Sequence, residues 1–95
     1  ANRFQSTGSV EKTLNMLSLA EKFRSFGWEA REIDGNKMGE IIAALDWATG
    51  VTGKPQAIIA HTVKAKGMPG FENTNCHFVK ITDEMIQTGQ AALQR

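Results

Sequence analysis

The sequence predicts an α/β fold built on a parallel sheet with flanking helices. The short apolar run at 56–61 is nearly continuous, which is typical of a strand buried on both faces of a parallel sheet. A strand expected at 28–33 precedes it, and a stretch with helical spacing separates the two. Such a strand–helix–strand unit implies parallel strands joined by a right-handed crossover. Ninety-five residues with 41% hydrophobic content limit the chain to one small domain.

The first half of the chain begins with a loop and continues with a helix and a strand. Residues 1–16 are rich in turn formers, so we expect them to be irregular. Ser18 and Glu21 form a capping-box pattern, a hydroxyl at the N-cap and a carboxylate three residues later, which predicts a helix over 19–26. Apolar and polar residues then alternate over 28–33, which indicates a strand with one face that is more exposed to solvent.

The next helix is expected over 37–49, and the turn 34–36 is expected to supply its N-cap. Its apolar side chains recur at helical spacing, so we expect them to form the core. They are Met38, Ile41, Ile42, Leu45 and Ala48.

The last part of the chain is a long loop followed by a helix. The loop runs over 62–81, and Thr82 caps a helix expected over 83–93. In open α/β sheets, ligands collect just beyond the carboxyl ends of the strands. This chain places His61, Lys64 and Lys66 there, so the loop is the candidate site.

Composition excludes several classes of function. A net charge of +1 leaves no electrostatic footprint for nucleic acid or a membrane surface. No apolar run approaches the roughly 20 residues that span a bilayer. Cys76 is the single cysteine, which excludes an intrachain disulfide and suits a reducing compartment. We therefore expect a cytoplasmic protein without nucleic-acid or membrane partners.

Two strands are too few for a stable parallel sheet. One edge stays bare and the strand 56–61 is poorly covered. The chain also starts without an initiator methionine. We therefore expect it to be a piece of a larger protein.

Four segments resemble transketolases in their order and spacing, above all the N-terminal-section subunit of split transketolases. They are Ser18–Trp28, Ile33–Asn36, Gly53–Pro55 and His61–Gly67. The resemblance covers essentially the whole chain. It implies a partial thiamine-diphosphate-binding fold, three-layer αβα when complete, in which residues 1–95 are the C-terminal part of the diphosphate-binding domain.

The resemblance also implies an activity and partners. Such enzymes use thiamine diphosphate and Mg²⁺ to transfer a two-carbon ketol unit from a ketose phosphate to an aldose phosphate. The partners implied are a sugar phosphate, the remainder of the N-terminal section, and a pyrimidine-domain subunit in a homo- or hetero-oligomer. That subunit supplies a glutamate that this chain lacks, so we expect the 95-residue chain alone to be inactive.

At the N-terminus, the resemblance implies a magnesium site. Asn2 resembles the terminal asparagine of a signature that opens with Gly-Asp-Gly, so its side-chain oxygen is expected to bind the metal. Phe4 is expected to offer its backbone carbonyl, and Mg²⁺ prefers such hard oxygen ligands. Because the aspartate of the signature lies outside these residues, we do not expect useful affinity from this chain alone.

In the loop, Lys66, Gly67 and Met68 are the residues that the resemblance places against the cofactor. The family's Lys-Gly-Lys-Gly has Ala65 at its second position here, a mild change if Ala65 has a negative φ. Lys64 is expected to attract substrate phosphate or a partner's carboxylate. The bland alternative for both lysines is a solvated loop charge.

Two histidines are expected to handle hydroxyl protons of the sugar. His61 ends the strand, and its alternative role is to hydrogen bond loop carbonyls. Long transketolases place a histidine where this chain has Pro69-Gly70, so His77 is expected to supply the imidazole from the far end of the loop.

Two other interpretations remain open. A deoxyxylulose-phosphate synthase or a 2-oxo acid dehydrogenase subunit shares the fold, although Phe26–Trp28 at the start of the strand and Lys54-Pro55 favour a transketolase. The other interpretation is a non-catalytic fragment, or an assembly half that completes another chain's fold.

Overall fold

The computed structural model describes residues 1–94, which form two compact units. The strand unit consists of Ala1 and Met16–Thr62. The loop unit consists of Asn2–Asn15 and the chain from Val63 onward. Each unit is described by itself.

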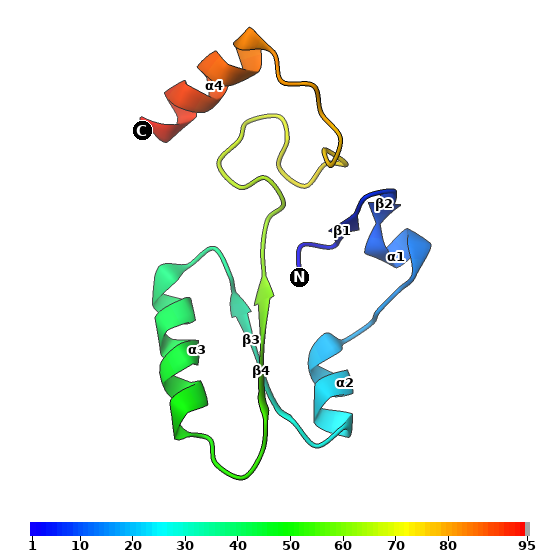
Figure 1. The fold of residues 1–95 in the computed structure, drawn as a ribbon, viewed down its shortest axis with the longest axis vertical. Helices are drawn as coiled ribbons and strands as arrows, with labels where there is room; N and C mark the ends of the chain where they lie inside the picture. The colour runs from blue at the N-terminus through cyan, green and yellow to red at the C-terminus, as the bar shows by residue number, and fades with distance from the viewer. Residues whose placement is uncertain (95) are drawn as a thin grey trace. The chain divides into compact units, whose positions relative to one another are not determined.

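The strand unit contains a parallel pair of strands with a helix on each side. Its elements are α2 (Leu19–Ser25), β3 (Glu29–Asp34), α3 (Met38–Gly50) and β4 (Gln56–His61). The register pairs Glu29 with Gln56 at one end and Asp34 with His61 at the other. Figure 1 shows the two arrows side by side, pointing the same way, between α2 and α3. The predicted α/β fold with a parallel sheet and flanking helices is confirmed.

The face of the sheet covered by α2 holds most of the core. Ala20, Ala30, Ala57 and Ile59 are buried there, and Leu19 and Phe23 pack against them. The predicted N-cap of α2 forms, because the Ser18 hydroxyl accepts a hydrogen bond from the Glu21 N–H at 3.2 Å. The capping hydroxyl replaces a hydrogen bond that the first turn of a helix cannot make internally.

The other face is covered by α3, and here the predicted core is largely wrong. Met38, Ile42 and Leu45 are 67%, 53% and 56% exposed. Ala44 is buried instead, and Ile41 and Ala48 are half-buried. Two strands about 4.8 Å apart are narrower than a helix about 10 Å wide, so they cover only part of its apolar face.

The turn between β3 and α3 follows different chemistry from that expected. The N-cap of α3 is Lys37, whose side chain makes no capping hydrogen bond, so the turn 34–36 does not supply the cap. Instead, the Asn36 N–H donates to Asp34 Oδ1 at 2.9 Å and closes a local turn. The Glu40 carboxylate accepts from the Asp34 N–H at 2.7 Å and holds the first turn of α3 against the strand end.

The loop unit begins with a small hairpin, so the prediction that residues 1–16 are irregular is wrong in part. β1 (Phe4–Gln5) pairs antiparallel with β2 (Gly8–Ser9), and α1 (Val10–Thr13) follows. The Val10 N–H donates to the Arg3 carbonyl at 2.9 Å and extends the hairpin. The tip of the hairpin consists of turn-forming residues and β2 contains a glycine. The composition of this segment is therefore the same as that of a loop, which explains the prediction.

The unit ends with α4 (Asp83–Leu93), whose Thr82 hydroxyl accepts from the Met85 N–H at 3.3 Å, as predicted. Among the described residues, none of the helices has the length and apolar character required to cross a bilayer.

Candidate functional site

The N-terminal segment of the loop unit presents a fixed amide oxygen. Asn2 Oδ1 accepts a hydrogen bond from the Phe4 N–H at 3.0 Å. Arg3, between them, has a φ of 64°, so the backbone turns sharply there. An amide oxygen has two lone pairs, so it can accept this hydrogen bond and still bind one further group.

An amide oxygen is a hard ligand that fits part of the coordination shell of Mg²⁺, which takes hard oxygens and keeps several waters. No cluster of three or more His, Cys, Asp or Glu side chains that could hold a metal occurs within residues 1–94. The residues present therefore fit only part of a magnesium ligand set.

Lys64 links this segment to the loop after β4. Its ammonium lies 5.3 Å from the centroid of the Phe4 ring, within the range of a cation–π contact. The Lys64 carbonyl accepts from the Asn73 N–H at 3.0 Å, which closes the loop behind it. Of the predicted site residues, Phe4 and Lys64 are thus brought together.

Lys66 and Gly67 share a partner that the sequence analysis missed. Glu72 Oε1 accepts from the Gly67 N–H at 2.8 Å and lies 3.6 Å from Lys66 Nζ. The Gly67 N–H, and secondarily the charge and hydrogen bond of Lys66, hold the pKa of Glu72 below its ordinary value of 4.5. A carboxylate five residues from a loop glycine matches no local motif, so only the folded loop reveals it.

Ala65 contradicts the expectation of a mild substitution. Its φ is 57°, in the left-handed region where a Cβ is strained and glycine is at ease. The Lys66 N–H donates to the Val63 carbonyl at 3.2 Å, and the Met68 N–H donates to the Ala65 carbonyl at 3.0 Å. These consecutive tight turns impose the conformation.

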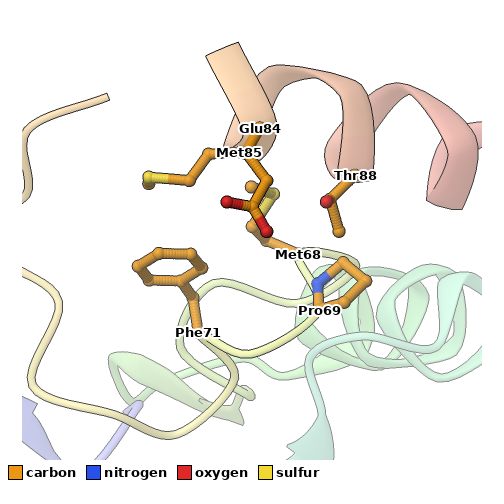
Figure 2. Close-up of a pocket in the computed structure, with 6 residues that line it drawn as sticks. All are labelled: Met68, Pro69, Phe71, Glu84, Met85 and Thr88. Atoms are coloured by element: carbon orange, nitrogen blue, oxygen red, sulfur yellow. The ribbon is translucent and has the colours of Figure 1, made fainter. Parts of the chain in front are cut away.

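Met68 packs against the last helix of the same unit. A Cβ placed on Gly89 of α4 would lie 3.1 Å from the Met68 sulfur, so the glycine allows this close approach. A pocket of about 310 Å³ opens beside the contact. Its lining residues come from the loop and the first turns of α4, as Figure 2 shows: Met68, Pro69, Phe71, Glu84, Met85 and Thr88.

His61 belongs to the strand unit, where its partner is a carboxylate. His61 Nε2 lies 2.9 Å from Glu32 Oε1, and both side chains are about half exposed. Because a carboxylate only accepts, Nε2 carries the proton in this contact. In this contact, the partner of the His61 ring is a carboxylate of β3 rather than a loop carbonyl.

His77 is exposed near the far end of the loop. Its ring packs edge-on against Phe78, with centroids 4.6 Å apart and planes at 88°. His61 and His77 lie in different units, so a shared substrate remains a prediction for this pair.

Comparison with known proteins identifies the family. The transketolase thiamine diphosphate binding domain family matches residues 1–93. This chain belongs to the transketolase family. The resemblance to transketolases that four segments of the sequence indicated is therefore confirmed.

Relatives of this transketolase-family chain include enzyme subunits. It is 34% identical over 95 residues to a 6-deoxy-6-sulfo-D-fructose transketolase subunit of a Clostridium species, covering 99% of this chain and 34% of that protein. It is 32% identical over 71 residues to an apulose-4-phosphate transketolase subunit of Phocaeicola vulgatus, covering 75% of this chain and 25% of that protein. The mouse transketolase-like protein 1 is 27% identical over 101 residues, which cover 94% of this chain and 17% of that protein. The chain thus spans about a third or less of the length of these relatives.

Proposed function

We propose that this chain forms the C-terminal part of the diphosphate-binding domain of a transketolase. The assembly transfers a two-carbon ketol unit from a ketose phosphate to an aldose phosphate and uses thiamine diphosphate and Mg²⁺. The observation that carries the proposal is the family match over residues 1–93. The names of two relatives, both of them transketolase subunits, support it.

The metal ligands we propose are the Asn2 side-chain oxygen and the Phe4 carbonyl. The hydrogen bond from the Phe4 N–H to Asn2 Oδ1 supports this role, because it orients the amide oxygen before a metal arrives. When bound, thiamine diphosphate supplies the carbanion-stabilising chemistry, and the protein contributes binding and orientation.

The cofactor-facing residues we propose are Lys66, Gly67 and Met68, with Lys64 directed to substrate phosphate. In this structure, the Glu72 carboxylate accepts a hydrogen bond from the Gly67 N–H and forms an ion pair with the Lys66 ammonium. These two donors already hold one anionic group, which supports a role in binding anionic oxygens.

The sugar-facing residues we propose are His61 and His77, which exchange protons with substrate hydroxyls. Glu32 fixes the ring of His61 through Nε2, so Nδ1 is the atom directed at other groups. The open position of His77 supports contact with a mobile ligand.

The partners we propose are the remainder of the N-terminal section and a pyrimidine-domain subunit, in a homo- or hetero-oligomer. The exposed side chains Met38, Ile42 and Leu45 on α3 support a covering partner, because single domains rarely leave such a contiguous apolar stripe in water. Because the resemblance implies that the pyrimidine-domain subunit supplies a glutamate that this chain lacks, we propose that the isolated chain is inactive.

The test uses the complete assembly, in which Asn2 and His77 are each replaced by alanine. We expect Asn2→Ala to weaken the binding of thiamine diphosphate with Mg²⁺ by at least about tenfold, as loss of a charge-assisted ligand would. We expect His77→Ala to lower kcat for ketol transfer by about a hundredfold while cofactor binding stays nearly intact.

Asn15→Ala in the same unit is the matched control and is expected to change neither quantity. Unchanged cofactor affinity in Asn2→Ala would remove the metal role. Turnover with pyruvate as donor, but not with a ketose phosphate, would favour a deoxyxylulose-phosphate synthase or 2-oxo acid dehydrogenase. Tight binding of thiamine diphosphate by the isolated chain in calorimetry would contradict its proposed inactivity.

A further inference from the structure

The loop that follows β4 folds back on itself, so that Glu72 faces Gly67. The Asn73 N–H donates to the Lys64 carbonyl at 3.0 Å and closes the segment between them. Glu72 immediately precedes this closure, and its Oε1 accepts a hydrogen bond from the Gly67 N–H at 2.8 Å. The same oxygen lies 3.6 Å from Lys66 Nζ. One carboxylate oxygen is therefore the acceptor for two donors of the proposed anion-binding segment.

The two donors that contact Glu72 are of the kind that bind phosphate. Backbone N–H groups of tight turns and lysine ammonium groups both bind phosphoryl oxygens. Gly67 has a φ of 90°. Apart from its chain neighbours, no atom within residues 1–94 would lie within 4 Å of a Cβ placed on it. An incoming ligand can therefore approach the Gly67 backbone closely.

The contact between Glu72 and these donors is weak enough to exchange. The side chains of Lys66 and Glu72 are 56% and 41% exposed, and exposed ion pairs are weak because water and salt screen them. Glu72 is charged at neutral pH, because the Gly67 N–H holds the pKa of its carboxyl below the ordinary value of 4.5. A glutamate side chain has several rotatable bonds, so its carboxylate can turn into solvent without a change in the backbone.

We propose that Glu72 is an intramolecular competitor, which a phosphoryl group displaces in order to bind the Gly67 N–H and the Lys66 ammonium. The proposal rests on the role in anion binding proposed above for Lys66 and Gly67. A phosphoryl group carries roughly two negative charges and three acceptor oxygens, so it replaces the single charge of the carboxylate with a stronger anion.

The tether between Glu72 and its donors sets the threshold that a ligand must exceed. Glu72 is five residues from Gly67 in the sequence. A group held by so short a linker acts at an effective concentration of about millimolar. Dilute or weakly binding anions therefore do not reach these donors, whereas a tightly held phosphoryl group does.

The test compares Glu72→Gln with the unaltered chain in the complete assembly, free of cofactor, with inorganic pyrophosphate as the probe. Binding is followed by NMR through the Gly67 amide resonance after selective isotope labelling. Glutamine keeps the size of the side chain but lacks its charge, so it competes poorly. We expect pyrophosphate to bind about fivefold more tightly to Glu72→Gln, the size of effect that an exposed charge pair has.

Glu11→Gln is the matched control, because it removes the same charge from an exposed position of α1 in the same unit. We expect it to change pyrophosphate affinity by less than about twofold, because salt screens a charge that makes no contact with the ligand. Equal affinities of Glu72→Gln and the unaltered chain, or no movement of the Gly67 resonance in either, would overturn the proposal.

A second measurement uses the unaltered chain, so it does not depend on how the variant folds. Saturating pyrophosphate is expected to move the carboxyl-carbon resonance of Glu72 to the position of a glutamate in free solution. A Glu72 resonance that stays in place while pyrophosphate binds would overturn the displacement.

The displacing phosphoryl group has two sources, the diphosphate of the cofactor and the phosphate of a sugar. Thiamine diphosphate with Mg²⁺ is therefore added first and inorganic phosphate second. Release of Glu72 at the first addition assigns the group to the cofactor, and release only at the second assigns it to the substrate. If Asn2→Ala weakens cofactor binding while Glu72 never leaves Gly67, the proposed function stands and this inference alone fails.

Discussion

At the scale of single residues, local backbone chemistry helps to hold the loop after β4. Ala65 takes a left-handed conformation, and Glu72 fastens the Gly67 N–H. Both features lie within ten residues of sequence, yet neither follows from a motif. At the position where anionic ligands are proposed to bind, the loop therefore contains a strained residue and a carboxylate that is hydrogen-bonded to a backbone N–H.

Ala65→Gly is expected to stabilise the chain by about 0.5–1 kcal/mol. Relief of left-handed strain is worth about 1–2 kcal/mol, and the extra freedom of glycine in the unfolded chain offsets part of it. The control, Ala43→Gly at an exposed helical position of α3, is expected to cost about 1 kcal/mol. Denaturant unfolding of both variants measures the difference, and the same sign for both would contradict the strain argument.

Acidification is expected to weaken the hydrogen bond between the Gly67 N–H and the Glu72 carboxylate. The pKa of Glu72 is lowered in the folded chain, first by the Gly67 N–H, so this contact contributes stability above the ordinary value of 4.5. That contribution is lost as the pH falls through the lowered pKa. The Gly67 amide shift, followed by NMR, should titrate below pH 4.5.

Glu72→Gln is expected to abolish that titration of the Gly67 amide, and Glu11→Gln is the control that leaves it in place. A Gly67 amide that titrates unchanged in Glu72→Gln would show that another group is responsible.

At the scale of elements, β3 ends where its backbone lies directly against β4. The Gly35 N–H donates to the His61 carbonyl at 2.7 Å. A Cβ on Gly35 would lie 2.7 Å from Thr62 Cγ2 and 2.8 Å from Ala60 Cβ. The absence of a side chain at this turn therefore sets the spacing between the strand ends.

Gly35→Ala is expected to destabilise the chain by about 1–3 kcal/mol, because the backbone must shift to relieve the overlap. Gly39→Ala is the matched control, since a Cβ there meets nothing within 4 Å. A helical alanine in its place is expected to stabilise by about 0.5–1 kcal/mol. Thermal unfolding compares the two, and an unchanged Gly35→Ala midpoint would contradict the close approach.

At the scale of the whole molecule, the apolar stripe of α3 is larger than its own chain covers. Met38, Ile42 and Leu45 remain more than half exposed. The parallel pair of strands is too narrow to bury them. A wider sheet would cover more of these side chains.

Leu45→Ser is expected to change the stability of the isolated chain by less than about 0.5 kcal/mol, as exposed substitutions do. In the complete assembly, the same change is expected to cost about 2 kcal/mol or more, because a buried leucine is lost. The control is Ala44→Ser, which is expected to be destabilising in both settings because Ala44 is already buried. Equal, small effects of Leu45→Ser in both settings would show that nothing covers the stripe.

The sequence by itself determined the order of the main helices and strands, the parallel pairing and the family. Periodicity, caps and turn residues are local signals. The N-caps Ser18 and Thr82 predicted where two helices begin, and the apolar run of β4 predicted a buried strand. Only the tertiary structure decided which apolar face of α3 stays exposed and which carboxylates hold Gly67 and His61. Those outcomes depend on contacts between groups that are distant in the sequence, and local sequence patterns do not encode such contacts.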